Sequence, residues 1–239
     1  MAIFQNSIVT RPAASYEIPY SGDFSGSSDV LYRTPSSASN RKTWTKSFWM
    51  KIGATGDGVI IGGNGGFDVM RFQASNKILL RFGASADRVT TATHTDTSNW
   101  IHYCLGSDTT QGVAANRAKF EVNGTAITSF SPDTLPGLNA ETSYWNNTLV
   151  NVIGAESGGS QGHNALYAEI VLIDGLMLSA STFRDSSTGL PIDPTGLTYG
   201  TNGALLQFAS SGAQGDDTSG NGNDWTNSGV SQSSDTPTS

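Results

Sequence analysis

Cysteine is nearly absent from this sequence, since Cys104 is the only one among 239 residues. No disulfide can therefore form within the chain. Because Cys104 stands in an apolar stretch, we expect it to be buried and to behave as a small hydrophobe. Charged residues are also scarce, at 14% of the composition, and the formal net charge is −7. Nucleic-acid binding needs clustered Lys and Arg, so this composition argues against a nucleic-acid partner.

Basic residues are concentrated in one stretch only, which holds Arg41, Lys42, Lys46 and Lys51. Apolar residues such as Trp44 are interspersed with them. We interpret this alternation as the solvent face of a strand, because a phosphate site would need its basic groups to converge on one point.

Long apolar runs are missing as well. No segment approaches the length of a membrane span, and residues 1–15 contain no apolar core as long as that of a signal peptide. We therefore expect no membrane insertion. Together with the single cysteine, this predicts a protein that folds in a reducing cytoplasm.

Glycine is abundant, with 28 residues, and serine and threonine are frequent, which is typical of a β protein rich in turns. Residues 99–130 show the pattern best. Two alternating strands, at 100–105 and 118–122, are followed by Asn123-Gly124 and a third predicted strand at 125–130. Asn-Gly between alternating runs indicates a tight hairpin, because its turn needs positive φ at both central residues.

Residues 43–52 form the longest predicted strand and carry large aromatic residues on both faces. Trp44 and Phe48 share one parity and Trp49 has the other, so we expect a central strand covered on both sides. One helical turn is expected at residues 179–185, with Ser179 as its N-cap. The other expected strands are residues 16–20, 30–33, 59–62, 67–73, 77–82, 88–93, 151–155, 166–173 and 204–208. The side chains expected to be largely buried are Trp44, Phe48, Trp100, Phe120, Val122, Val152, Ile170 and Leu172.

A long motif in the first fifth of the chain resembles a known family. It consists of Phe24, Ser28, Leu31, the run RTPSSA at 33–38, the run NRKTWT at 40–45, Ser47, Trp49 and Lys51. The run AEIVLIDGLML at 168–178 and the polar turn DTSGNGND at 217–224 belong to the same pattern. Together they resemble the laminin-G-like, concanavalin A-like domains of phage and metagenomic viral proteins.

The resemblance implies a fold, a division of the chain and a function. The fold is an all-β, concanavalin A-like (laminin-G-like) jelly-roll sandwich of two antiparallel sheets. Residues 16–208 would form the sandwich, residues 1–15 an N-terminal arm, and residues 209–239 a polar segment that packs back on the sandwich edge. The implied function is that of a virion structural protein on capsid or tail, assembled in the host cytoplasm, with weak binding to host-surface glycans. A host lectin is a further alternative, against which the missing signal peptide and disulfides weigh.

A polysaccharide-cleaving enzyme of the same fold is the rival interpretation. Retaining hydrolysis needs two carboxyl groups about 5 Å apart, which a strand supplies from acids at i and i+2 or i+4. No glutamate of this chain has an acidic residue at such a spacing. A G-x-S-x-G motif is absent, and His94, His102 and His163 lack the spacing of metal ligands. We therefore expect no enzyme activity, no zinc site and no cofactor.

Calcium is left open at the C-terminal turn. Asp216, Asp217, Asn221, Asn223 and Asp224 offer hard oxygen ligands within nine residues. The alternative is a cluster of Asx turns that satisfies its own backbone. The spacing matches no EF-hand loop, so we expect the structural cluster and predict no metal site.

A sugar platform is predicted in the loop that follows residue 131. Tyr144, Trp145 and Asn146, with His163 beside them, combine aromatic faces with planar polar groups, the chemistry that recognises pyranose rings. The alternative is that Trp145 folds back over the edge of the sandwich.

Residues 1–15 are expected to act as an attachment arm. They mix Ile3, Phe4, Ile8 and Val9 with polar residues and carry one charge, Arg11. Such a segment is too short to form its own core, and it gains most by docking on another subunit. We therefore expect contacts with other virion proteins through the arm and a homo-oligomeric assembly; the alternative is a frayed terminus.

Overall fold

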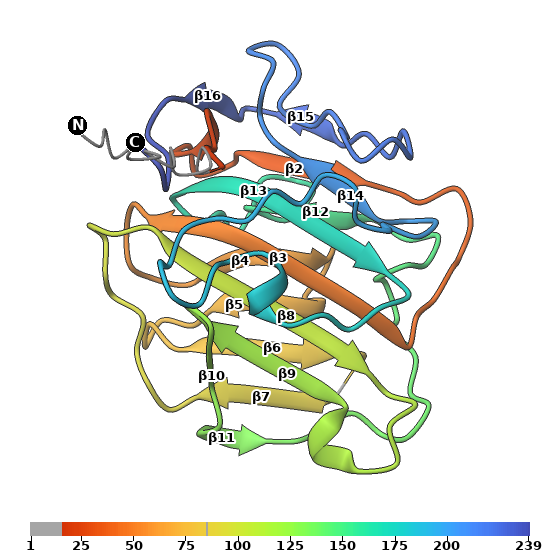
Figure 1. Ribbon diagram of the computed structural model, residues 1–239. Coiled ribbons are helices and arrows are strands. Elements are labelled where there is room, and N and C mark those ends of the chain that lie inside the picture. Colours follow the sequence, from red (N-terminus) through yellow and green to blue (C-terminus); the bar gives the residue numbers. More distant parts are fainter. Residues whose placement is uncertain (1–15, 85) are drawn as a thin grey trace, which may run out of the picture.

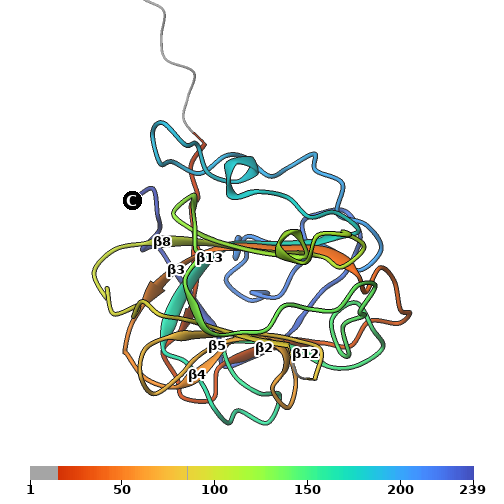
Figure 2. The same ribbon diagram turned by 90° about the horizontal axis from the view of Figure 1, so that it is seen from below.

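The computed structural model describes residues 16–84 and 86–239. Its strands form two antiparallel sheets that stack face to face around the apolar core (Figures 1 and 2). In the described part of the chain, helix is limited to two 3-10 turns, η1 (Ala114–Asn116) and η2 (Ala180–Thr182). The predicted fold class, an all-β sandwich of two antiparallel sheets, is confirmed.

The first sheet is built around β3 (Thr43–Ile52) and β13 (Ala165–Asp174), which pair along most of their length. Its order is β10-β9-β8-β3-β13-β1-β16, with β14 paired to the second half of β13. The bounds of its other strands are β1 (Ser21–Phe24), β8 (Ile101–Asp108), β9 (Ala118–Val122), β10 (Thr125–Ala126), β14 (Ala204–Leu206) and β16 (Ser231–Ser233).

The second sheet has the order β11-β7-β6-β5-β4-β12-β2-β15, and every neighbouring pair is antiparallel. In β5 and β6 the side chains alternate, so that Met70, Phe72, Leu80 and Phe82 face the core. The bounds are β2 (Val30–Arg33), β4 (Gly58–Gly63), β5 (Phe67–Phe72), β6 (Ile78–Phe82), β7 (Ala86–Thr90), β11 (Phe130–Asp133), β12 (Asn151–Ile153) and β15 (Thr226–Ser228).

Strand β3 is covered on both faces, as its two aromatic stripes predicted. Trp44 and Phe48 belong to the core between the sheets. Trp49 lies on the outer face, where it packs with Ile18 and Ala168. Both faces of β3 are therefore buried along most of the strand, as expected for a central strand.

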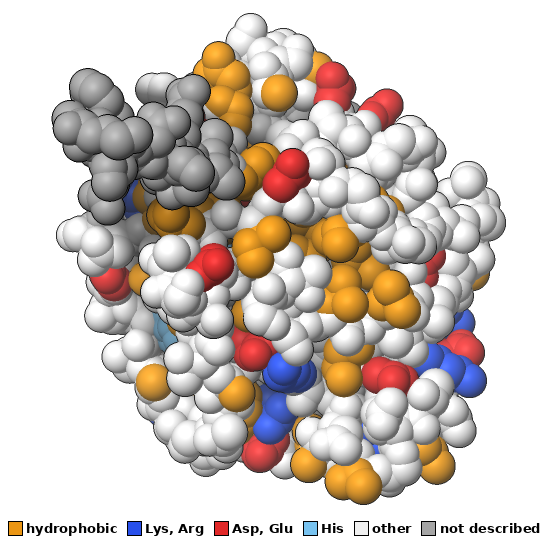
Figure 3. All heavy atoms as spheres, in the orientation of Figure 1, with side chains coloured by type: hydrophobic (Ala, Val, Ile, Leu, Met, Phe, Trp, Pro, Cys, Tyr) orange, Lys and Arg blue, Asp and Glu red, His pale blue; other side chains and the backbone are white. Residues whose placement is uncertain are grey.

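Residues 175–200 form a further layer over the outer face of the first sheet (Figure 2). Apolar side chains gather where this segment lies in the space-filling view (Figure 3), and Leu176 and Leu190 are among its exposed ones. Beneath it lies a buried cluster of Cys104, Val171, Ile173, Ala180, Phe183, Tyr199 and Leu205. The burial predicted for Cys104 is confirmed. The predicted helical turn exists only as η2, and Ser179 makes no capping hydrogen bond through its side chain.

Two local predictions in the 99–130 region are wrong. The strand predicted at 125–130 is divided, because β10 stays in the first sheet while β11 begins at Phe130 and pairs with β7 in the second. Trp100 and Val122 are half-buried, although both were expected in the core. Each stands at a strand end, and the Trp100 indole N–H donates to Asp235 Oδ1 at 2.8 Å.

The C-terminal segment contributes more than its polar composition suggests. The strand predicted at 204–208 is followed by β15 and β16, which add an edge strand to each sheet. Trp225 and Val230 from this segment are buried in the main core. At the last residues, Thr238 Oγ1 accepts from the Ile18 N–H at 3.0 Å, so the C-terminal residues lie beside the start of the described chain. The predicted arm, residues 1–15, lies outside the described residues.

Candidate functional site

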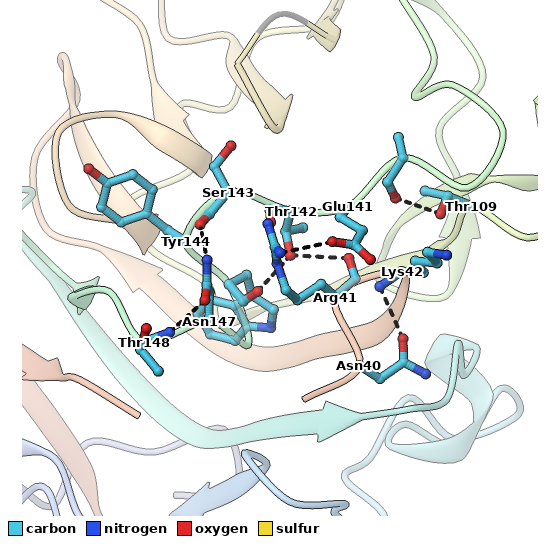
Figure 4. Close-up of polar contacts among 12 residues, drawn as sticks. Asn40, Arg41, Lys42, Thr109, Glu141, Thr142, Ser143, Tyr144, Asn147 and Thr148 are labelled. Carbon is cyan, nitrogen blue, oxygen red and sulfur yellow. Dashed lines mark hydrogen bonds and ion pairs between the residues drawn. The ribbon is translucent and has the colours of Figure 1, made fainter. Parts of the chain in front are cut away.

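The loop between β11 and β12 is held against the start of β3 by a dense set of hydrogen bonds (Figure 4). The Arg41 side chain donates to the Thr142 carbonyl at 2.7 Å and to Glu141 Oε2 at 2.8 Å. In return, the Thr142 N–H donates to the Arg41 carbonyl at 3.0 Å. Thr109 Oγ1 donates to the Ala140 carbonyl at 2.7 Å. These contacts fix residues 140–147 against the rest of the sandwich without regular secondary structure.

The Asp68 side chain, at the beginning of β5, also holds the 140–147 loop in place. Its carboxylate accepts from the Gly83 N–H at 2.5 Å and from the Tyr144 N–H at 2.6 Å. The side chain is buried, so both hydrogen bonds lie out of competition with water. Asp68 thus ties the turn after β6 and the 140–147 loop to the beginning of β5.

Lys46 lies buried next to Asp68, which contradicts the prediction that it faces solvent. Its Nζ donates to the Asp68 carbonyl at 3.2 Å and lies 3.7 Å from the centre of the Trp145 ring and 4.9 Å from that of Trp44. The parity of β3 places Lys46 on the core face with Trp44 and Phe48, and the two indoles make that position tolerable for a cation. Burial lowers the pKa of Lys46 to about 7, and Asp68 opposes this shift.

An accessible aromatic pair lies next to the buried Asp68 and Lys46. The rings of Phe67 and Tyr144 stack at 5.2 Å with an interplanar angle of 8°. Phe67 is 37% exposed and Tyr144 is half-buried. Gly63 permits the pairing, since a Cβ at that position would collide with the first carbons of the Tyr144 side chain. Stacked rings with exposed faces and edges can receive the apolar side of a planar or cyclic ligand.

A cleft of about 210 Å³ opens beside the pair, between the two sheets at one end of the sandwich. The first sheet contributes Ser107, and Thr109 follows it; the second sheet contributes Phe82 and Ala86. The loop closes the cleft with Pro136, Gly137, Ala140, Glu141, Thr142 and Ser143. The walls therefore combine an apolar floor with hydroxyl groups and one carboxylate, the surface that suits a polyhydroxylated ligand.

A second, shallower groove of about 430 Å³ lies on the outer face of the second sheet. Arg71 and Arg81 line it, and the Gly65-Gly66 turn and Glu156 form its border. Each arginine is already paired, Arg71 with Asp57 and Arg81 with Asp87, both at 2.7 Å. The hydrogen bond to Asp87 raises the pKa of Arg81. Fixed, charge-balanced donors and acceptors of this kind are suited to hydroxyl groups.

The structure does not bring the four predicted sugar-binding residues together. Trp145 is 4% exposed in the core, Asn146 is 4% exposed with its amide donating to Asp174 Oδ1 at 3.0 Å, and His163 is 3% exposed. His163 packs on Phe72 at one end of β5, whereas Tyr144 packs on Phe67 at the other, about 16 Å away at strand rise. Burial excludes Trp145, Asn146 and His163 from direct ligand contact, and Tyr144 alone remains accessible.

Sequence reasoning missed Phe67, Arg71 and Arg81. Strict alternation in residues 67–73 and 77–82 was a usable signal, because it places both arginines on the face opposite the core residues. What it could not give was the pairing of Phe67 with Tyr144, since that depends on how the loop folds back.

The histidines do not provide a catalytic group at this site. Burial lowers the pKa of His94 and of His163 to about 4 and that of His102 to about 3. His102 Nε2 lies 2.8 Å from Ser47 Oγ, but these two side chains are 0% and 1% exposed under the 175–200 layer. The pair has the spacing of a base and a nucleophile and no room for a substrate.

The C-terminal turn uses its aspartate oxygen atoms on backbone N–H groups of the turn and of β14. Asp217 accepts from the N–H groups of Leu205, Ser219 and Asn223 at 2.8 to 2.9 Å. Asp224 Oδ1 accepts from the Asp217 N–H at 2.9 Å. In the part of the chain that the structure covers, no cluster of three or more His, Cys, Asp or Glu side chains is arranged to hold a metal ion. Within the same residues, no helix is long and apolar enough to cross a membrane.

Solved structures share this architecture at low sequence identity. A Bacteroides ovatus protein provisionally described as carbohydrate-binding superposes with a TM-score of 0.63 and 14% identity, over 92% of this chain and 60% of the other. A native heptameric SAP-like pentraxin from Limulus polyphemus gives a TM-score of 0.57 and 14% identity, over 94% of this chain and 100% of the other. Trypanosoma rangeli sialidase matches with a TM-score of 0.42 and 15% identity, over 59% of this chain and 22% of the other.

This chain therefore spans less than two thirds of the Bacteroides protein, and at these identities the likeness concerns the fold alone. No curated protein matches the sequence. Residues 25–181 match the family model described as the concanavalin A-like lectin/glucanases superfamily. That range includes strands β2 to β13 and the whole candidate site, and the chain belongs to this superfamily.

Proposed function

We propose that this protein is a non-enzymatic, lectin-like module that binds glycans at the rim formed by Phe67, Tyr144 and the adjacent cleft. The observation that carries the proposal is the accessible aromatic stack beside a hydroxyl-lined opening. A pyranose presents an apolar face and a ring of hydroxyl groups. The aromatic pair would receive the first, and Ser143 and Glu141 would hydrogen-bond the second.

We place this module in a virion, as a structural protein displayed on capsid or tail with its rim toward the host surface. The support is the long motif at residues 24–51, which resembles phage and metagenomic viral proteins. A lectin-like display protein needs only modest affinity per copy, because many copies bind one surface together. A cryo-EM map of the particle, with this chain fitted into density, would test the location.

Residues 1–15 would attach the module to other virion proteins or to a second copy. Deletion of residues 2–12 should leave the sandwich folded, because residues 16–84 and 86–239 by themselves form both sheets and a packed core. The same deletion should abolish incorporation into particles or self-association. Full assembly of the shortened chain would mean that attachment lies on the sandwich itself.

A polysaccharide-cleaving enzyme is the rival function. The cleft and the groove described above each have one carboxylate in their walls, Glu141 and Glu156. Hydrolysis of a glycosidic bond by the usual routes needs two carboxyl groups that flank it. Glu141 is moreover engaged by Arg41 at 2.8 Å. Incubation with bacterial surface polysaccharides should release no reducing ends; their release would favour the enzyme.

Binding itself is tested on an array of bacterial surface polysaccharides, followed by titration of those that bind. Tyr144→Ala should raise Kd tenfold or more, which is equivalent to a loss of about 1.4 kcal/mol in binding free energy. Tyr20→Ala is the control, since it removes an exposed tyrosine ring that lies outside the site. If the two variants bind equally well, the rim is not the binding site.

A further inference from the structure

The cleft and the outer groove each include a residue next to one ring of the Phe67–Tyr144 stack. Ser143, next to Tyr144, lines the cleft, whereas Gly65 and Gly66, next to Phe67, border the groove. A Cβ on Gly65 would lie 3.9 Å from the Phe67 ring. The stacked pair is thus directly connected to both openings through its chain neighbours.

The backbone joins the two hollows a second time. Arg81 lines the groove and donates to the Gly66 carbonyl at 3.4 Å, and two residues later Gly83 lines the cleft. Asp68 holds the Gly83 and Tyr144 N–H groups with one carboxylate. Since this carboxylate is buried, the cleft, stack and groove keep a fixed relative position before any ligand arrives.

Neither hollow by itself matches a complete ligand site. The cleft, at about 210 Å³, is below the range of about 300–1,000 Å³ that is usual for small-molecule sites. The groove is larger, at about 430 Å³, but it is shallow and polar, and no aromatic side chain of the described residues lines it. The apolar platform and the polar groups are thus distributed over three adjoining parts.

We propose that cleft, stack and groove form one continuous track for a linear polysaccharide. One sugar would enter the cleft, the next would lie on the Phe67–Tyr144 pair, and the following sugars would run into the groove toward Arg71. This inference rests on the proposed glycan-binding function and adds to it the class of ligand: a chain of several sugars that is bound along its length.

The charges of the groove favour a neutral chain. Both arginines are neutralised by their partners Asp57 and Asp87, and Glu156 adds a further negative charge. The Glu156 carboxylate accepts from the Gly65 N–H, so its position is fixed. An acidic polysaccharide would meet these carboxylates, and the two basic side chains that line the groove are already paired. Neutral hydroxyl groups, in contrast, can use paired donors and acceptors.

The test uses fragments of one bacterial surface polysaccharide that the array identifies, cut and sized into chains of one to eight sugars. The affinity of the full-length protein for each fragment is measured by calorimetry. Kd should fall at least tenfold between the disaccharide and the hexasaccharide. Raising the salt concentration from 0.05 to 0.5 M should change Kd less than twofold. Salt screens attraction between exposed charges over this range, and a neutral ligand carries no charge to be screened.

Arg71→Gln removes a groove contact far from the cleft, and it should weaken hexasaccharide binding more than disaccharide binding. Lys51→Gln is the matched control, since it also breaks an ion pair of 2.7 Å, but on the first sheet. Melting temperatures of both variants check that the fold is intact. Equal affinity for all fragment lengths would overturn the track and leave the rim lectin standing. Binding to no polysaccharide would overturn both, and strong weakening by salt would overturn the neutral ligand.

Discussion

The outer faces of the two sheets carry comparable polar groups, yet one is sealed and the other is open. On the first sheet, Ser47 and His102 are within hydrogen-bond distance and are both inaccessible. On the second sheet, Arg71 and Arg81 stand in a groove that solvent reaches. The difference comes from the covering layer and not from the strands, because both pairs occupy alternate outward positions of ordinary antiparallel ladders.

The covering layer differs because of its apolar content. The 175–200 segment inserts Ala180 and Phe183 among outward residues of the first sheet such as Val171. The second sheet has a smaller outer cluster around Val59 and Val152, which leaves its arginines uncovered. A short distance between polar side chains is therefore not enough to make a functional site in this fold. The side chains must also be accessible to a ligand.

The largest expected effect is a loss of stability when the layer that covers the first sheet is damaged. Phe183→Ala should lower the free energy of unfolding by about 3–5 kcal/mol, because it removes a buried aromatic ring from the covering layer. Phe67→Ala on the open rim should cost less than about 1 kcal/mol, since Phe67 is 37% exposed. Urea unfolding of both variants measures the contrast. Similar losses for the two would show that the rim ring is as structural as the covered one.

The next effect concerns the lysine beneath the rim. The pKa of Lys46 in the folded chain is about 7, whereas its ordinary value is 10.5. Between these values the unfolded chain binds more protons, so stability should rise with pH by up to about 1.4 kcal/mol per pH unit. The stabilisation is absent below pH 7, where both states are protonated. Lys46→Met should remove this slope, and the difference between wild type and variant in urea unfolding at pH 7, 8 and 9 measures it.

A kinetic effect should sharpen the contrast between the sealed and the open face. Burial raises the pKa of the Cys104 thiol under the covering layer, and the residue is 1% exposed. A thiol reagent at pH 8 should therefore react with the native protein at least 100-fold more slowly than with the urea-unfolded chain, because the thiolate is the reactive form. Phe183→Ala should speed up the native reaction. Fast labelling of the native wild type would mean that the layer opens readily.

At the C-terminal turn we expect no effect of metal removal on the melting temperature. Since Asp217 and Asp224 use their oxygens on backbone N–H groups, a chelator should leave the melting temperature unchanged. A rise of the melting temperature on addition of calcium would contradict this, because a ligand bound only by the folded state stabilises it.

Local patterns in the sequence determined most of the strands. Alternation placed Phe120 and Phe48 in the core, and Asn123-Gly124 predicted the hairpin between β9 and β10. These signals act between neighbours in the chain, so they survive without knowledge of the fold. They failed at strand ends, such as Trp100, where burial depends on a distant segment.

The candidate site was decided by the tertiary structure. Tyr144 stacks on Phe67, which is far away in sequence, whereas the indole of Trp145 is buried against Lys46 and the core. Lys46 itself has the polarity of a surface residue and the position of a core residue. The sequence by itself specified which side chains alternate and where turns occur. Which of the outward side chains meet solvent was settled only when loops of different apolar content folded back over the two sheets.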